Sequence, residues 1–182
     1  MIRAALLLLA LFGGTAGAGE LFNERGLRTD RYRAPLPDSV PHGQRVDAGR
    51  ARALIAEKDL LLIDVQAITV RPELADLGIT FLPNKPRLHI PGSHWLPNVG
   101  YGELDETMDG YFRGNLARLT GGDFTRPMLF YCVADCWMSW NAVQRAHHYG
   151  YRQLYWLADG TEAWAAAGFE LVEGQPLPLE PH

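Results

Sequence analysis

Short runs of apolar residues alternate along the chain with longer segments in which apolar residues recur every three or four positions. The runs at 60–65, 127–132 and 153–157 predict strands, because a strand that is buried on both faces of a sheet carries no polar face. The periodic segments predict helices with one apolar face. These helices are expected at residues 47–57, 104–119, 139–149 and 159–168. The alternation of strands and helices indicates an α/β fold, a parallel sheet with helices on both faces.

Several residues mark where the predicted elements begin and end. Asp47 is a suitable N-cap for the first helix, and Gly121 follows the second helix as a typical stop. Asp159 and Glu162 have the spacing of a capping box and predict the start of the last helix. Residues 169–172 are expected to return as a short strand.

The N-terminus has the features of a cleaved signal peptide over residues 1–18. Arg3 provides a positive charge, residues 4–12 form an apolar run, and residues 16–18 form an Ala-x-Ala cleavage site. The apolar run is about half of the roughly 20 residues that a membrane-spanning helix requires. We therefore expect an exported, periplasmic bacterial protein that has no membrane attachment after cleavage.

Two segments without regular periodicity lie on either side of the first predicted strand. Residues 19–45 are rich in prolines and charged residues, and they predict an extended lead-in that packs on the surface of the domain. Residues 67–88 contain scattered prolines and predict an irregular insertion. The folded domain itself is expected over residues 46–182, because the regular elements begin there.

Length, composition and charge limit the function classes. The chain has 182 residues, of which 47% are hydrophobic and 21% are charged, which is typical of one globular domain with short additions. The net charge is −4 and there is no run of lysines or arginines, which argues against a nucleic-acid partner. No phosphate-binding or dinucleotide-binding loop occurs, so no cofactor is predicted.

The two cysteines, Cys132 and Cys136, lie between a predicted strand and a predicted helix. Outside the cytosol such a pair can persist as a disulfide. Positions i and i+4 of a regular helix place Cβ atoms about 5 to 6 Å apart, which is beyond the roughly 3.5 to 4.5 Å of a disulfide. The cysteine loop, residues 132–136, must therefore be non-helical if the two sulfur atoms are to meet.

The position of Cys132 favours ionisation of its thiol. A thiol at this edge of a parallel sheet faces the free N–H groups at the start of the next helix, and these donors favour a thiolate. Asp135 acts against ionisation, because like charges raise each other's pKa. Arg145 is the nearest cation that follows, but it lies two turns into the helix and is expected to point elsewhere.

Several short motifs together resemble the rhodanese homology domain over about residues 46–175. They are LIDV at 62–65, HIPG at 89–92, FYC at 130–132, and the segment from Gly150 through Trp164 to Gly168. The run CVADCWMSWN at 132–141 further resembles the exported proteins named PQQ-dependent catabolism-associated CXXCW motif proteins. Three residues separate the cysteines here, whereas that name describes two.

The resemblance implies a rhodanese-like fold in which Cys132 is the sulfur-carrying nucleophile. It also implies a role beside periplasmic quinoprotein oxidation of alcohols. The implied partner is a quinoprotein dehydrogenase or a cytochrome system, and PQQ would be present only through that partner. Active rhodaneses commonly place a cationic residue and small residues in this loop, whereas this loop holds Asp135 and Trp137. Sulfur transfer from thiosulfate is therefore disfavoured.

Three hypotheses follow for the cysteine loop. In the first, Cys132 is the thiolate nucleophile and Cys136 the resolving partner in thiol–disulfide or persulfide (sulfurtransferase-type) chemistry. In the second, the domain is catalytically inactive and binds a partner protein. In the third, which ranks below the first, the thiols bind copper(I) with a histidine, and the candidates are His94, His147 and His148. The residues expected to bind substrate or to shape the loop are Asp135, Trp137, Ser139 and Trp140.

Other polar residues are expected to have structural roles. Asp64 ends a buried strand and is expected to accept hydrogen bonds from backbone N–H groups of an adjacent loop. His89 is expected to fix the turn that contains Pro91. His147 and His148 lie near the end of a helix, where a positive charge is favourable.

Overall fold

The computed structural model describes residues 21–69, 81–83 and 85–179 of the chain. The signal peptide expected at residues 1–18 lies outside the described residues, as does part of the irregular segment expected at 67–88. Among the described residues, no helix has the length and apolar character needed to cross a membrane.

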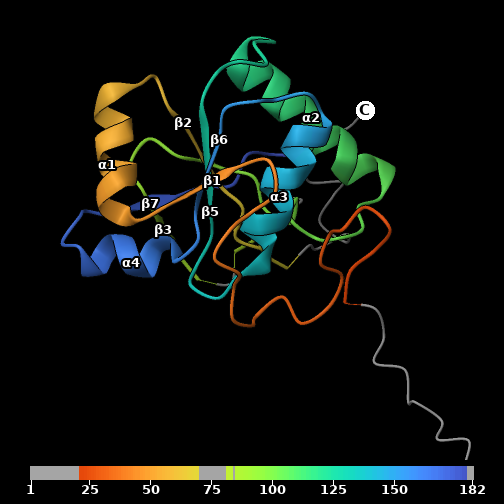
Figure 1. The fold of residues 1–182 in the computed structure, drawn as a ribbon, viewed down its shortest axis with the longest axis horizontal. Helices are drawn as coiled ribbons and strands as arrows, with labels where there is room; N and C mark the ends of the chain where they lie inside the picture. The colour runs from red at the N-terminus through yellow and green to blue at the C-terminus, as the bar shows by residue number, and fades with distance from the viewer. Residues whose placement is uncertain (1–20, 70–80, 84, 180–182) are drawn as a thin grey trace, which may run out of the picture.

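Five short strands form the central sheet in the order β1-β6-β5-β2-β4, and every neighbouring pair is parallel. They are β1 (Gln44–Val46), β2 (Leu61–Asp64), β4 (His94–Trp95), β5 (Met128–Tyr131) and β6 (Leu154–Leu157). β2 and β5 are buried along their whole length, which confirms the strands predicted from the apolar runs. Figure 1 shows these strands between two groups of helices.

Helices cover both faces of the sheet (Figure 1). They are α1 (Ala48–Glu57), α2 (Glu106–Thr120), α3 (Trp137–His148) and α4 (Gly160–Ala166). α1 and α4 pack on one face and α2 and α3 on the other, because the buried residues of each pair join a separate hydrophobic cluster. Successive residues of β5 divide between the clusters, since Phe130 packs with α2 and α3 and Leu129 with α1 and α4. This arrangement confirms the predicted α/β fold.

The helix ends agree with the sequence at α1 and α2 and differ at α4. The Asp47 side chain caps α1 by accepting a hydrogen bond from the Arg50 N–H at 2.7 Å. Gly121 ends α2 in the left-handed conformation, with φ 64°. The capping box predicted at Asp159 is wrong, because the backbone there is not extended (φ −83°, ψ 2°) and the side chain makes no cap hydrogen bond. The Asp159 carboxylate instead lies 3.3 Å from Arg45 of β1.

A separate two-stranded sheet joins the irregular segment to the C-terminal part of the chain. β3 (Arg87–His89) pairs antiparallel with β7 (Val172–Gly174). The sequence predicted a strand over residues 169–172, but the observed strand β7 begins at Val172 and lies outside the central sheet. The hydrophobic pattern did not predict β1 or β3, because strands of three residues are too short to show a period.

Gly160, the first residue of α4, lies directly against the cysteine loop. Its φ is +59°, and a Cβ atom there would be 2.5 Å from the Cys132 carbonyl oxygen and 2.7 Å from backbone atoms of Val133. The Thr161 N–H also donates a hydrogen bond to the Cys132 carbonyl oxygen at 3.1 Å. The N-terminus of α4 therefore supports the loop through backbone contacts that leave no room for a side chain.

We expect Gly160→Ala to lower the free energy of unfolding by about 1–3 kcal/mol, because the added methyl group meets fixed backbone atoms and alanine disfavours a positive φ. Urea denaturation followed by tryptophan fluorescence would measure the change. Gly114→Ala is the matched control, since Gly114 is exposed within α2 and a Cβ atom there meets nothing. Alanine at that position should stabilise by up to about 1 kcal/mol. Equal effects of the two substitutions would contradict the close approach of α4 to the loop.

Candidate functional site

The cysteine loop connects β5 to α3 and brings the two thiols together. Cys132 directly follows β5, and Cys136 is the N-cap residue of α3. The loop between them is non-helical, with Asp135 in the left-handed conformation at φ 53°. The two Sγ atoms are 2.6 Å apart, and both cysteines are free thiols. The structure thus confirms that a non-helical loop places the two sulfur atoms in contact.

Both thiols are buried in the hydrophobic cluster that α2 and α3 form with the sheet. The exposed fraction is 0% for Cys132 and 3% for Cys136. The Cys132 Sγ also lies 3.2 Å from Gln66 Oε1, so this thiol has two acceptors within reach. Access to either sulfur therefore requires movement of a neighbouring side chain or segment.

The pKa values of the two thiols shift in opposite directions. Burial raises the pKa of Cys132 well above its ordinary value, and the neighbouring sulfur acts in the same direction. The pKa of Cys136 is lowered to about 7, in the first place by the hydrogen bond from Cys132. The Met138 N–H at the start of α3 and the charge of Arg33 lower it further. The helix N-terminus thus favours a thiolate at Cys136, whereas the sequence predicted one at Cys132.

A buried ion pair supports the cysteine loop from the sheet. The Arg87 Nε lies 2.7 Å from Asp64 Oδ2, and the Arg87 Nη2 donates to Asp64 Oδ1 at 3.1 Å. The same Nη2 donates to the Cys132 carbonyl oxygen at 3.2 Å. Asp64 also accepts a hydrogen bond from the Gln66 N–H at 3.0 Å, which confirms its predicted role toward an adjacent loop.

Arg87 is the residue of this site that the sequence did not reveal. It lies in the segment expected to be irregular, and no spacing or period distinguishes it from the other arginines. The sequence feature that could have indicated Arg87 is Asp64, because a carboxylate at the end of a buried strand requires a cation or several hydrogen-bond donors. β3 brings that cation to the end of β2.

Two backbone N–H groups, one in the cysteine loop and one at the start of α3, already have oxygen acceptors within the protein. The Ala134 N–H donates to Glu162 Oε2 at 2.9 Å. The Trp137 N–H donates to the Tyr32 carbonyl oxygen, also at 2.9 Å. N–H groups at the start of a helix are the donors that hold an anion. The Ala134 and Trp137 N–H groups are therefore not free to hold an anionic sulfur group.

The lead-in crosses the cysteine loop as an extended strap formed by residues 32–34. Arg33 forms an isolated antiparallel β-bridge with Cys136. On one side of this bridge the Ala34 N–H donates to the Asp135 carbonyl oxygen of the loop at 3.1 Å, and on the other side the Trp137 N–H at the start of α3 donates to the Tyr32 carbonyl oxygen at 2.9 Å. The strap thus covers Cys136.

Trp137 and Trp140 fasten the lead-in to the first turn of α3. The Arg28 guanidinium lies over the Trp137 ring, 4.5 Å from its centroid. The Trp140 Nε1 donates to the Ser39 carbonyl oxygen at 3.1 Å. Phe22 contacts both indole rings edge-on. Both tryptophans are buried, so they hold the strap in its place over the loop.

Ser139 is buried behind the end of the loop, whereas Asp135 is exposed at its turn. The buried Ser139 hydroxyl donates to the Cys136 carbonyl oxygen at 3.2 Å and accepts from the Trp156 Nε1 at 2.9 Å. Asp135 is exposed, and its left-handed backbone turns the chain toward α3. Ser139 therefore ties the end of the loop to β6, and Asp135 shapes its outer surface.

A cavity of about 650 Å³, which we call the loop cavity, opens beside the cysteine loop. Its wall includes Val133 of the loop, Arg33 of the strap and Arg87 of the ion pair. Gln66 also lines it, and the Gln66 Oε1 contacts the Cys132 Sγ. The side chain of Gln66 therefore separates the loop cavity from the sulfur pair.

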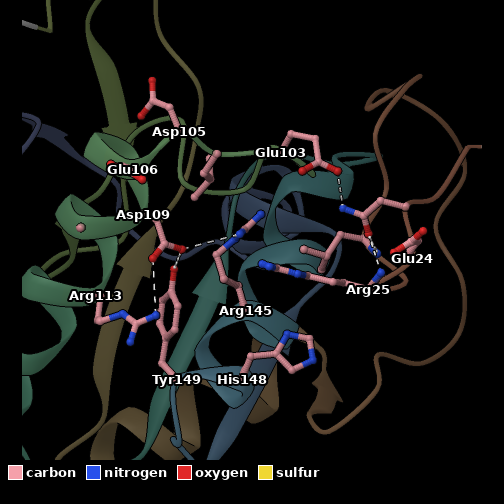
Figure 2. A pocket seen from close by; sticks show the side chains of 14 residues that line it. Glu24, Arg25, Glu103, Asp105, Glu106, Asp109, Arg113, Arg145, His148 and Tyr149 are labelled. Atoms are coloured by element: carbon pink, nitrogen blue, oxygen red, sulfur yellow. Dashed lines mark hydrogen bonds and ion pairs between the residues drawn. The ribbon is translucent and has the colours of Figure 1, made fainter.

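A second cavity, of about 670 Å³, is lined by the lead-in, the N-terminal part of α2 and the C-terminal end of α3. Figure 2 shows Arg113, Arg145 and Tyr149 around Asp109, which accepts a hydrogen bond from the Tyr149 hydroxyl at 2.5 Å. Arg145 lies 3.8 Å from Asp109, and its Nη2 donates to the Tyr101 carbonyl oxygen at 2.7 Å. Arg145 is thus engaged away from the cysteine loop, as predicted.

The candidate histidines do not gather at the sulfur pair. Within the part of the chain that the structure describes, no group of three or more histidine, cysteine or acidic side chains could hold a metal ion. The His147 ring stacks on the His42 ring, with the two ring centroids 3.8 Å apart. His94 lies in β4. The copper(I) hypothesis therefore lacks a histidine ligand beside the cysteines in this part of the chain. His89 is buried, with its Nδ1 4.0 Å from Asp64 Oδ2.

Several solved structures resemble this fold at low sequence identity. The structure of YnjE matches with a TM-score of 0.52 and 18% identity, over 78% of this chain and 33% of that chain. A thiosulfate sulfurtransferase from Pseudomonas aeruginosa matches with a TM-score of 0.47 and 18% identity, over 74% of this chain, which spans 21% of that protein. A polysulfide-sulfur transferase from Wolinella succinogenes matches with a TM-score of 0.45 and 17% identity, over 72% of this chain and 79% of that chain.

Sequence comparison identifies the family. No curated protein matches the sequence. The family described as the rhodanese-like domain matches residues 47–167, which is more than half of the chain. This chain therefore belongs to the rhodanese-like domain family.

Proposed function

We propose that this protein performs thiol–disulfide exchange with the Cys132–Cys136 pair. The observation that carries the proposal is the contact of the two Sγ atoms, which are 2.6 Å apart in a non-helical loop. A disulfide bond is about 2.05 Å long, so closure requires an approach of roughly half an ångström. A second thiol at this distance can resolve a mixed disulfide that forms on the first.

In the proposed exchange the Cys136 thiolate attacks first, because its pKa is lowered to about 7. It forms a bond to one sulfur of a substrate disulfide, and the other substrate sulfur leaves as a thiolate. The Cys132 thiol then gives its proton to that leaving thiolate and attacks the Cys136 Sγ. The mixed disulfide breaks and the second substrate thiolate leaves. The protein pair loses two electrons as it becomes a disulfide, and the substrate gains them.

The contacts of the loop support disulfide exchange more than persulfide transfer. The N–H groups of Ala134 and Trp137 are engaged by acceptors of the protein, so they are not free to hold an anionic sulfur group. Asp135 adds a carboxylate at the surface of the loop, which disfavours a further negative charge there. Disulfide exchange needs no anion site within the loop itself.

The cellular setting is also part of the proposal. We place the protein in the periplasm, beside a quinoprotein dehydrogenase or a cytochrome system of alcohol oxidation, with PQQ held by the partner. The signal-peptide pattern of residues 1–18 and the resemblance of residues 132–141 to the CXXCW motif proteins support this setting. In an oxidising compartment the pair would cycle between dithiol and disulfide.

Export is tested by a fusion of residues 1–45 to alkaline phosphatase without its own signal. We expect active phosphatase, because its disulfides form only outside the cytosol. A fusion of residues 19–45 is the matched control and should be inactive. Equal activity of the two fusions would argue against export by this segment.

Thiol reactivity should follow the ionisation of Cys136. Because its pKa is lowered to about 7, alkylation of the reduced protein by iodoacetamide should speed up as the pH rises through 7 and slow as acid protonates the thiolate. In Cys136→Ser the remaining thiol should react only at higher pH, since burial raises the pKa of Cys132. Mass spectrometry from about pH 5 to pH 10 would measure both profiles. Identical profiles would contradict the assignment of the thiolate.

The order of attack predicts which variant traps a mixed disulfide. Cys132→Ser keeps the attacking thiolate and loses the resolving thiol, so it should accumulate a mercaptoethanol adduct after treatment with bis(2-hydroxyethyl) disulfide. Cys136→Ser should form little adduct, because the pKa of Cys132 is raised. Mass spectrometry without reductant would detect the adduct, and the wild type should show an internal disulfide instead.

Two other outcomes of this trapping experiment are informative. An adduct on Cys136→Ser alone would reverse the order of attack and restore Cys132 as the nucleophile. Absence of reaction in the wild type and in both variants would favour the hypothesis of an inactive domain that binds a partner protein.

A further inference from the structure

The loop cavity has the size of a small-molecule site. Its volume of about 650 Å³ falls within the roughly 300 to 1,000 Å³ typical of ligand pockets. Its wall combines Arg33 of the strap with residues 66–69 after β2 and residues 85–87 at the start of β3. Arg33 lies outside the residues that match the family, 47–167. The cavity is therefore built in part by a segment that lies outside the family match.

Unpaired positive charge distinguishes the loop cavity. Arg33 and Lys85 line it, and within the described part of the chain neither side chain forms a hydrogen bond or an ion pair with a carboxylate, although the charge of Arg33 acts on Cys136. Arg87 lines it as well, but its charge is neutralised by the buried carboxylate 2.7 Å away. The Glu162 carboxylate lies in the same wall and accepts neutral donors, among them a backbone N–H of the cysteine loop, so the wall keeps one positive charge in excess. Since the whole chain has a net charge of −4, this positive charge is a local property of the cavity.

Apolar side chains form another part of the wall. Among them are Ile68, Pro86, Trp95 and Val133. Such a surface favours a hydrocarbon chain, because its burial removes apolar area from water. A ligand that combines a short hydrocarbon chain with a terminal carboxylate would satisfy both parts of the cavity.

Gln66 controls access from the loop cavity to the sulfur pair. Its Oε1 accepts a hydrogen bond from the Cys132 Sγ at 3.2 Å, and its Nε2 donates to the Ala67 carbonyl oxygen at 3.1 Å. Rotation of this side chain breaks those two hydrogen bonds and opens the way to Cys132. Because the two Sγ atoms are 2.6 Å apart, a group that displaces the amide of Gln66 contacts the Cys132 Sγ and lies next to the Cys136 Sγ.

We infer that the loop cavity binds a small disulfide whose chains end in carboxylates and presents its S–S bond to the Cys132–Cys136 pair. This inference rests on the proposed thiol–disulfide exchange. Arg33 and Lys85 bind the carboxylates, and the apolar wall holds the hydrocarbon chains. One substrate disulfide is reduced to two carboxylate-bearing thiols while the protein pair is oxidised to a disulfide, so two electrons pass from protein to substrate.

Three symmetric disulfides of similar size test the inference. Dithiodipropionate is anionic, bis(2-hydroxyethyl) disulfide is neutral and cystamine is cationic. For each disulfide, two rates would be measured: its oxidation of the reduced wild-type protein and its reaction with free mercaptoethanol. The first rate divided by the second is the normalised rate, which removes differences in the intrinsic reactivity of the disulfides. We expect the normalised rate to be about tenfold higher for the anionic than for the neutral disulfide at low salt, and lowest for cystamine. The preference should shrink at high ionic strength.

Matched lysine variants locate the charge that produces this preference. Lys85→Gln should lower the ratio of the anionic to the neutral rate by about threefold. Lys58→Gln removes the same charge at the end of α1, outside the loop cavity, and should leave the ratio unchanged. Arg33→Gln should lower the ratio and also raise the pKa of Cys136, because the charge of Arg33 lowers that pKa.

The outcomes separate this inference from the proposed function. Equal normalised rates for the three disulfides, or equal ratios in Lys85→Gln and Lys58→Gln, would overturn the inference and leave thiol–disulfide exchange intact. If none of the three disulfides oxidises the pair, the exchange itself is wrong, and the inference falls with it.

Discussion

The buried ion pair of Asp64 and Arg87 is the interaction on which the cysteine loop depends. It joins the end of β2, the strand β3 and the carbonyl group of Cys132, which come from distant parts of the sequence. A carboxylate as buried as that of Asp64 persists only with such partners, and removing one partner of a buried pair costs about 3–5 kcal/mol. Together with the close approach of Gly160, the pair holds the loop in the one shape that brings the sulfur atoms into contact.

The two thiols touch, yet their electrostatic surroundings differ. Cys132 ends the central strand and is enclosed by the hydrophobic core, so its ionised form lacks solvent and its pKa is raised. Cys136 is the N-cap residue of α3, and its pKa is lowered first by the hydrogen bond from Cys132 and then by the Met138 N–H and the charge of Arg33. One thiol is thereby held as a proton donor and the other as an acceptor. A stepwise exchange requires this division between an attacking and a resolving thiol.

The lead-in belongs to the site as much as the family domain does. The family match begins at residue 47, yet the strap at residues 32–34 covers Cys136. Asn141 of α3 anchors the lead-in by accepting the Arg28 N–H and donating to the Arg28 carbonyl oxygen, both at 2.8 Å. The burial of Cys136, the lowering of its pKa and part of the charge of the loop cavity all depend on this segment. The site therefore includes residues that lie outside the family match.

The sequence by itself determined the layered fold and the place of the two thiols. The apolar runs at 60–65 and 127–132 form strands only when both faces are covered, and the end of the second run puts Cys132 and Cys136 between a strand and a helix. Only the tertiary structure decided that Arg87 supports the loop, which thiol ionises, and that the lead-in covers the pair. Each of these outcomes requires groups from distant segments to meet in space, and a local hydrophobic period carries no information about such contacts.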